Sequence, residues 1–443
     1  MIRLTWVQPE DLVGHELRQA AEDGRDVADV AARWHAAGGH EAPPRAGASP
    51  PDALGLRGLA EELLDELSSR ESPLEEPSGL AEIVSLCPAW PVAGGGAERP
   101  DHDRVLGAWL GRAAGCVLGK PVEKIPREGV RAIAEATGNW PIRGWFTAAG
   151  LPSEINERWP WNRRSAVNSL AENIDGVPED DDLNYPLLAL SVLERHGRDF
   201  TTDDVAKLWL DELPAGRTFT AERVAYRNLL AGVEPPETAT RRNPFREWIG
   251  ALIRTDVYGW VNPGDPAKAA EYAWRDARLT HTANGVYGAM FVAAMCARSM
   301  VASSVKEVVE AGLSVVPPGS RLAHAVRQAV EDAGRLADFE QVLDRLHERH
   351  GHLHWVHTIN NAALVAATLV HGDGDFTASI AGAVAGGWDT DSAGATVGSI
   401  VGALNGGVPG QWRMRDSLAS SLTGFDGIAL SELARRTERM MVA

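Results

Sequence analysis

Glycine recurs at every fourth position in two separate segments of this chain. The two runs consist of Gly107, Gly111, Gly115 and Gly119, and of Gly394, Gly398, Gly402 and Gly406. Residues four apart share one face of a helix, where each glycine costs roughly 0.5–1 kcal/mol relative to alanine. A whole face of glycine therefore indicates that another backbone approaches closely along it. We expect two closely packed helices at the centre of the fold.

Most of the remaining chain has the periodicity of α-helices. Leucines at helical spacing mark helices over 54–67 and 183–193, and Thr201 and Asp204 have the spacing of a helix capping box. Residues 8–36 predict a helical pair or one acidic helix. Further helices are expected at 245–256, 266–278, 284–300, 319–333, 358–371, 376–385 and 392–404. Alternating runs typical of strands are scarce, so we predict an all-α fold.

The charge is acidic and unevenly distributed. The 443 residues include 61 acidic and 43 basic side chains, a net charge of −18, which argues against a nucleic-acid partner. Residues 1–100 alone carry 18 acidic and 8 basic side chains, and residues 40–52 and 91–100 are rich in proline, alanine and glycine. We therefore expect an acidic, partly flexible helical N-terminal extension over 1–100, available for self-association or partner binding, and a main domain over 101–443.

Cysteine usage and hydropathy bear on the cellular compartment. Cys87, Cys116 and Cys296 are too few and too widely spaced for a disulfide framework or a zinc ribbon. The first residues show no basic segment that leads into an apolar one, and no window offers about 18 uninterrupted apolar residues. We expect a cytoplasmic protein that neither spans nor binds a membrane.

Two acidic clusters each precede a predicted helix. Four acids occupy 179–182, and Asp389 and Asp391 flank Thr390 before the second glycine run. Capping of a helix N-terminus explains one or two acids, but four adjacent acids repel one another, and a cation relieves that repulsion. Oxygen ligands suit hard cations such as Mg²⁺, Mn²⁺ or Ca²⁺. Together with Glu123, which follows the first glycine run, the clusters predict one shared metal site.

These segments resemble the motifs of the ADP-ribosylglycohydrolase family, the group of the dinitrogen-reductase-activating glycohydrolase and crystallin J1. The similarity lies in Gly-Arg-Ala-Ala-Gly-Cys-Val-Leu-Gly-Lys-Pro-Val-Glu at 111–123, in the three aspartates at 180–182, and in Gly-Trp-Asp-Thr-Asp-Ser at 387–392. It extends to segments 275–281, 284–289 and 357–361, and covers roughly residues 103–410.

The resemblance implies a compact orthogonal bundle of helices that holds two divalent ions, usually Mg²⁺, in a cleft. Such a hydrolase cleaves a glycosidic N- or O-bond at the anomeric carbon of an ADP-ribosyl or related ribosyl group, on a small molecule or a protein, and its metals hold the ribose hydroxyls and the attacking water. Carried over by position, the metal ligands are Asp180, Asp181, Asp182, Asp389, Asp391 and Ser392. The catalytic residues are Glu123, Asp181 and Asp391. The substrate-binding residues are His281, Asn284, Tyr287, His357 and Asn360.

Three departures mark a divergent member of this family. The first motif reads Asp-Asp-Asp-Leu where the family typically has Thr-Asp-Asp-Thr, so the site carries an additional carboxylate. Cys116 stands where many members have aspartate, and residues 1–100 have no counterpart in the compact family core. We therefore expect that the substrate is a ribosyl compound other than ADP-ribosyl-arginine.

Tryptophans gather in a long stretch rich in proline and glycine, residues 138–165. They are Trp140, Trp145, Trp159 and Trp161. Either they pack on the core, or they form a lid that stacks on adenine or another planar base. The histidines between 347 and 357 do not complete a zinc motif, and helix-end hydrogen bonding explains most of them.

Two other functional classes were compared with the glycohydrolase. An all-α enzyme of terpenoid diphosphates would use the Asp181-Asp182 pair, but Tyr185 stands where a further acid is wanted, and Asp389-Thr390-Asp391 is not the second motif of that class. A non-catalytic protein that binds a nucleotide or ADP-ribose, or a structural protein on the same fold, remains the alternative.

Overall fold

The computed structural model describes residues 4–42, 47–92, 100–162 and 165–441. Within these ranges the chain forms α-helices and short 3-10 turns, and its β-type contacts are isolated bridges such as that between Trp248 and His357. The predicted all-α class is therefore confirmed. Residues 43–46 and 93–99 of the two expected breaks, and 163–164 of the tryptophan-rich stretch, lie outside the described residues.

The two glycine runs lie on two helices that pack against each other, α5 (His102–Gly119) and α19 (Thr390–Asn405). A Cβ atom on Gly111 would lie 2.0 Å from the carbonyl oxygen of Gly398, and one on Gly115 would lie 1.8 Å from that of Gly394. The expected close approach of two backbones is confirmed, and the runs are each other's partners in antiparallel order. Gly406 differs, because it ends α19 with a φ of +66°.

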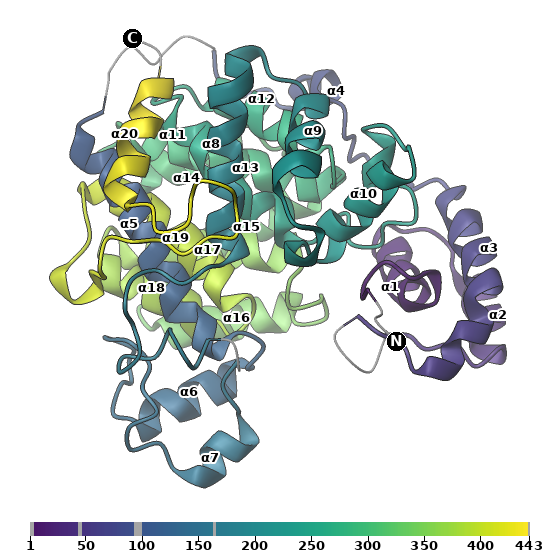
Figure 1. The fold of residues 1–443 in the computed structure, drawn as a ribbon, viewed down its shortest axis with the longest axis horizontal. Coiled ribbons are helices and arrows are strands. Elements are labelled where there is room, and N and C mark those ends of the chain that lie inside the picture. Colours follow the sequence, from purple (N-terminus) through teal and green to yellow (C-terminus); the bar gives the residue numbers. More distant parts are fainter. Residues whose placement is uncertain (1–3, 43–46, 93–99, 163–164, 442–443) are drawn as a thin grey trace.

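Several other helices of the main domain pack against this pair, whereas others lie farther from it, as Figure 1 shows. In the first half they are α6 (Arg127–Ala136), α7 (Ser153–Arg158), α8 (Asp181–His196), α9 (Thr202–Glu212), α10 (Thr220–Leu230), α11 (Asp256–Trp260), α12 (Pro266–Ala277) and α13 (Ala283–Ser299). In the second half they are α14 (Val305–Ser314), α15 (Arg321–Arg335), α16 (Phe339–His350), α17 (Thr358–Gly372), α18 (Phe376–Ala385) and α20 (Leu430–Met440).

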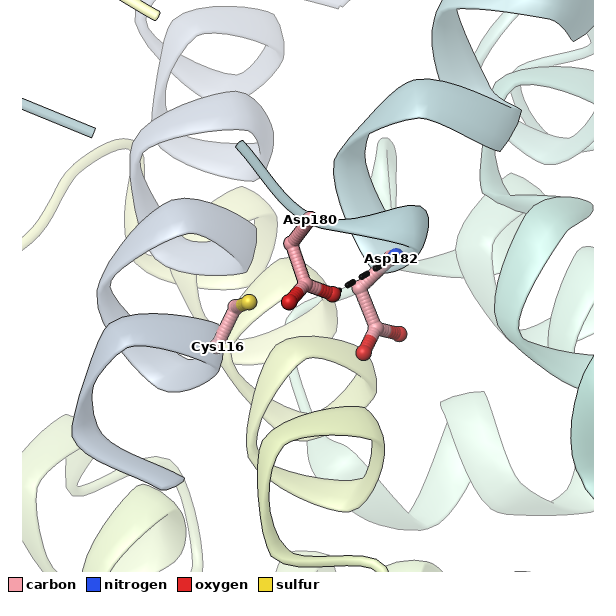
Figure 2. A group of neighbouring side chains, drawn as sticks. All are labelled: Cys116, Asp180 and Asp182. Atoms are coloured by element: carbon pink, nitrogen blue, oxygen red, sulfur yellow. Dashed lines mark hydrogen bonds between the residues drawn. The ribbon is translucent and has the colours of Figure 1, made fainter. Parts of the chain in front are cut away.

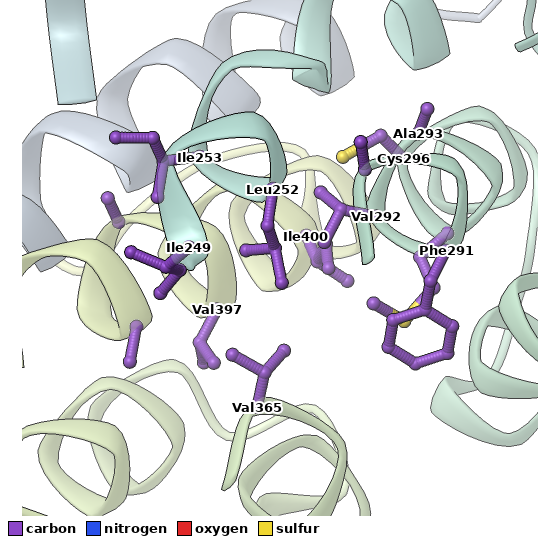
Figure 3. Close-up of a cluster of buried hydrophobic side chains, with 14 of the residues drawn as sticks. Ile249, Leu252, Ile253, Phe291, Val292, Ala293, Cys296, Val365, Val397 and Ile400 are labelled. Carbon is purple, nitrogen blue, oxygen red and sulfur yellow. The ribbon is translucent and has the colours of Figure 1, made fainter. Parts of the chain in front are cut away.

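All but one of the segments predicted to be helices are helical in the structure. Residues 245–256 do not form an α-helix; their centre is the 3-10 turn Ile249–Arg254. The backbone N–H of Ile249 donates to the carbonyl oxygen of Val356, at 2.9 Å, rather than to a residue one turn earlier. A tertiary hydrogen bond thus replaces the helical one. The turn's apolar side chains join those of α13, α17 and α19 in the buried cluster of Figure 3.

The described residues before position 100 form four α-helices: α1 (Pro9–Glu22), α2 (Ala28–Ala36), α3 (Arg57–Ser68) and α4 (Leu80–Leu86). The expected helical pair over 8–36 is confirmed. Leu63, Leu64 and Leu67 of α3 are buried in a cluster that also contains Phe245 and Trp248 of the main domain. The described part of the extension therefore shares a hydrophobic core with the main domain.

Buried ion pairs also connect the N-terminal extension to the main domain. Arg246 donates to Glu16 at 2.8 Å and to Asp23 at 2.6 Å, and all three side chains are less than a tenth exposed. Arg321 contacts Glu76 at 2.6 Å. These guanidinium groups of the main domain therefore neutralise part of the acidity of the extension.

Cys87, Cys116 and Cys296 are free thiols, and all three are buried. Cys296 lies in the cluster of Figure 3. Among the described helices, none combines the length and the apolar character that crossing a bilayer requires.

Candidate active site at the crossing of the glycine helices

The antiparallel packing of α5 and α19 brings two of the predicted motifs together. The last residue of α5, Gly119, lies against the first turn of α19, where an added Cβ would be 2.2 Å from the carbonyl oxygen of Thr390. Lys120 and Glu123 follow directly after α5, and Asp389 and Asp391 lie at the start of α19. The close glycine contact therefore places the motif of Glu123 beside the second acidic loop.

The first acidic loop caps α8. The carboxylate of Asp180 accepts a hydrogen bond of 2.9 Å from the backbone N–H of Asp182, so Asp180 is a helix cap. Its other oxygen is ion-paired with Lys120. Figure 2 shows this carboxylate between the thiol of Cys116 and the side chain of Asp182. One ligand atom from each of these three residues lies within 4.8 Å of the others.

The two acidic loops are in direct contact. The hydroxyl of Ser392 donates to one oxygen of Asp182 at 3.1 Å, and the other oxygen lies 3.3 Å from the guanidinium of Arg112. Arg112 is fully buried and also pairs with Asp256 at 3.0 Å. No role was predicted for Arg112 from the sequence, because its acidic partners follow 70 and 144 positions later.

The remaining aspartates are crowded by negative charge. Burial raises the pKa of Asp181 well above its usual range, and repulsion from Asp180 and Asp391 adds to the shift. Burial, with repulsion from Asp391 and Glu123, likewise raises the pKa of Asp389. The pKa of Asp391 rises to about 7 for the same reasons, burial first and then Glu123. Each of these carboxylates would be stabilised by a cation.

The chemistry of the donors fits a hard divalent cation. Asp181, Asp389 and Asp391 supply carboxylate oxygens, and Ser392 supplies a hydroxyl at the junction of the two loops. Mg²⁺, Mn²⁺ and Ca²⁺ bind such oxygens, whereas the thiol of Cys116 is a soft donor that they do not favour. The residues present therefore suit the type of metal that the motifs predict.

Glu123 faces a cavity of about 360 Å³ beside these loops. Asn162 donates to one of its carboxylate oxygens at 2.5 Å, and Lys124 lies 3.0 Å from the other. Trp159 and Trp161 line the cavity, together with Lys124, Ile125, Pro126, Arg158, Pro160 and Asn162. The carboxylate is therefore held in one orientation at the mouth of an aromatic pocket.

The predicted tryptophan lid divides into two parts. Trp159 lines the cavity of Glu123, as described above. Trp145 instead packs edge-on against Trp412, with ring centroids 4.8 Å apart, and its indole N–H donates to the carbonyl oxygen of Gln411. The core-packing interpretation therefore holds for Trp145, whereas Trp159 and Trp161 are placed to meet a ligand beside Glu123.

Two further side chains hold the second acidic loop. The imidazole of His347 stacks on Trp388, with centroids 4.4 Å apart, and its Nε2 lies 2.8 Å from the carbonyl oxygen of Gly386. The side-chain oxygen of Asn361 accepts from the backbone N–H of Asp389 at 3.3 Å. Sequence reasoning selected the preceding Asn360 and assigned no role to Asn361, although both amides stand in the same motif.

The five predicted substrate-binding residues are buried and make contacts within the protein. Asn284 donates to Glu76 at 2.7 Å, the hydroxyl of Tyr287 donates to the carbonyl oxygen of Pro77 at 2.6 Å, and Nε2 of His357 lies 3.5 Å from Glu22. These three partners belong to the N-terminal extension. The extension therefore packs directly on residues of the family-like motifs.

The other two residues contact the main domain. His281 lies 2.6 Å from the hydroxyl of Thr280, and Asn360 donates to the carbonyl oxygen of His354 at 3.1 Å. None of the five is among the described residues that line the cavity of Glu123. The predicted metal ligands and Glu123 thus lie on neighbouring loops, but among the described histidine, cysteine, aspartate and glutamate side chains only Cys116, Asp180 and Asp182 form a group whose ligand atoms all lie within 4.8 Å of one another. The five substrate-binding candidates lie outside the cavity of Glu123.

Comparison with known proteins agrees with the motifs. A family model described as ADP-ribosylglycohydrolase matches residues 97–440, and the chain therefore belongs to the ADP-ribosylglycohydrolase family. It is 29% identical over 308 residues to an uncharacterized protein of Archaeoglobus fulgidus, covering 68% of this chain and 88% of that protein. A solved ADP-ribosylglycohydrolase-related protein complex is 23% identical, covers 77% of this chain and 99% of its own, and has a TM-score of 0.49.

Proposed function

We propose that this protein is a Mg²⁺-dependent glycosyl hydrolase that cleaves the bond at the anomeric carbon of an ADP-ribosyl or related ribosyl group. The observation that carries the proposal is the meeting of two acidic loops, joined by the Ser392–Asp182 hydrogen bond, beside the cavity of Glu123. Asp181, Asp389, Asp391 and Ser392 hold the cation. When bound, the cation supplies positive charge that orients the ribose hydroxyls and acidifies water.

Glu123 is the proposed general base. Asn162 and Lys124 each contact one oxygen of the Glu123 carboxylate and keep it in one orientation. From this position the carboxylate takes a proton from the attacking water. The water oxygen forms the new bond to the anomeric carbon, the bond to the departing nitrogen or oxygen breaks, and the proton that Glu123 took from the water passes to that atom. Asp181 and Asp391 would act in this step through the cation that they position.

The cavity beside Glu123 suits a nucleotide-like substituent. Trp159 and Trp161 supply aromatic surface for a base, and the guanidinium of Arg158, which lies 4.9 Å from the centroid of the Trp159 ring, supplies positive charge for phosphate oxygens. These features support a substrate that carries a base and phosphate beyond the ribose, as an ADP-ribosyl group does.

Substitution of the second acidic loop tests the proposal. Asp389→Asn and Asp391→Asn are expected to lose both Mg²⁺ binding and sugar release from arginine-, serine- or nucleobase-linked ribosyl substrates, while circular dichroism reports an intact fold. Asp211→Asn is the matched control, because Asp211 is an exposed carboxylate that pairs with Lys207 on the helix surface. Wild-type turnover in both loop variants would exclude the proposed mechanism.

A non-catalytic binding protein on the same fold makes a different prediction. Calorimetry would then show that ADP-ribose binds in the presence of Mg²⁺, whereas none of the ribosylated substrates would release sugar. Running both assays on the same preparation separates the two functions.

A further inference from the structure

Lys120 is a buried cation inside the acidic site. Its side chain is 10% exposed, and its ammonium contacts the carboxylate of Asp180 and, at 3.1 Å, the carbonyl oxygen of Glu179. The second oxygen of Asp180 accepts the backbone N–H of Asp182 at 2.9 Å. Both oxygens of Asp180 therefore already have partners within the chain.

Asp182 is engaged in the same way. One of its oxygens pairs with the buried Arg112 and the other accepts from Ser392. The cluster of Cys116, Asp180 and Asp182, whose ligand atoms lie within 4.8 Å of one another, thus contacts two protein cations. In the described parts of the chain, no lysine or arginine forms an ion pair with Asp181, Asp389 or Asp391.

We infer that the ammonium of Lys120 replaces one of the two divalent ions implied by the family resemblance, so that the chain binds a single divalent ion at Asp181, Asp389 and Asp391. The inference rests on the metal site of the proposed function and specifies its stoichiometry. A divalent ion at Asp180 would have to displace a buried ammonium and leave it without a counter-charge, which is unfavourable. The negative charge of the additional carboxylate, Asp180, and the positive charge of the buried Lys120 thus neutralise each other.

Counting bound Mn²⁺ tests this assignment. Equilibrium dialysis of the metal-free protein against Mn²⁺, with metal analysis of both compartments, is expected to give one ion per chain for the wild type. Lys120→Met releases the carboxylate of Asp180 and is expected to raise the count to two. In Lys120→Met/Asp180→Asn the amide keeps the helix cap without the charge, and the count is expected to return to one.

Lys124→Met is the matched control, because Lys124 is 62% exposed and pairs with Glu123. It is expected to keep one ion. Two ions on the wild type, or one ion on a folded Lys120→Met variant, would overturn the inference. If Lys120→Met does not fold, the wild-type count alone decides.

The number of Mn²⁺ ions bound per chain is measured independently of the rate of sugar release. One Mn²⁺ bound without any sugar release supports the stoichiometry and contradicts the glycohydrolase. Sugar release by a protein that binds two Mn²⁺ ions supports the glycohydrolase and contradicts the stoichiometry.

Discussion

The hydroxyl of Thr390 donates a hydrogen bond of 2.9 Å to the carbonyl oxygen of Gly119. The last carbonyl groups of a helix have no partner within that helix, and Thr390 satisfies this one at the end of α5. Because Thr390 is also the first residue of α19, the bond joins the two glycine helices at the end where the acidic residues lie. The position of Glu123 relative to Asp391 therefore depends on how closely α5 and α19 pack.

Gly111→Ala is expected to destabilise the protein by roughly 3 kcal/mol, since overpacking a tight core contact has costs of this size. The added methyl would lie 2.0 Å from the carbonyl oxygen of Gly398, and neither backbone can move without separating the helices. Urea unfolding followed by circular dichroism measures the change in the free energy of unfolding.

Gly334→Ala is the control for this effect. Gly334 lies in α15 with no atom within 4 Å of an added Cβ, so the alanine is expected to stabilise the helix by roughly 0.5–1 kcal/mol. Equal effects of the two substitutions would show that helix propensity alone explains the glycine runs.

Features of the fold that depend on residues near in sequence were predicted correctly. The capping box of Thr201 and Asp204 forms with both of its hydrogen bonds, and the glycine spacing indicated the α5–α19 contact. The α-helix predicted at 245–256 is absent for a tertiary reason. The backbone N–H of Ile249 donates to the carbonyl oxygen of Val356, which lies 107 residues later in the sequence. A local sequence pattern does not predict a hydrogen bond between residues so far apart.

The same distinction applies to the candidate site. Spacing and motif similarity selected Asp181, Asp389 and Asp391, because these residue types stand together before a helix. The cations that neutralise the neighbouring acids were not predicted, since Arg112 reaches Asp256 and Lys120 reaches Asp180 only after folding. Charge compensation depends on three-dimensional proximity, which a single sequence does not contain.

Trp159→Ala is expected to raise KM for an ADP-ribosylated substrate roughly tenfold with little change in kcat, because stacking of a base on an aromatic ring contributes roughly 1–3 kcal/mol. The indole of Trp159 lines the cavity of Glu123. Trp145→Ala should leave KM unchanged, since Trp145 packs on Trp412 outside that cavity. Initial-rate kinetics on both variants measures these KM values. A wild-type KM for Trp159→Ala would contradict stacking of a base on Trp159.

Arg246→Met is expected to destabilise the whole chain by roughly 3–5 kcal/mol, because it leaves Glu16 and Asp23 buried without their counter-charge. The extension shares a core with the main domain, so one cooperative unfolding transition is expected in urea. Arg33→Met removes exposed ion pairs within the extension and should have an effect below about 1 kcal/mol. A separate early transition for the extension would show that the two parts fold independently.

His15 is expected to make stability fall in mild acid. Burial, with a smaller contribution from Arg18, lowers the pKa of its imidazole to about 4 in the folded protein, whereas an unfolded histidine titrates near 6.5. Between about pH 6.5 and 4 the unfolded chain therefore binds the additional proton, and this histidine lowers the free energy of unfolding by roughly 1.4 kcal/mol per pH unit as the pH falls.

His15→Phe removes that contribution and keeps a ring against Phe245 and Trp248, which lie 5.1 and 5.6 Å from the imidazole centroid. Urea unfolding of the variant between about pH 6.5 and 4 should show a pH slope smaller than wild type by roughly 1.4 kcal/mol per unit. His324→Phe, which replaces an exposed histidine by the same residue, is the control for the substitution itself. An unaltered slope in His15→Phe would mean that His15 titrates in the folded protein as it does in the unfolded chain.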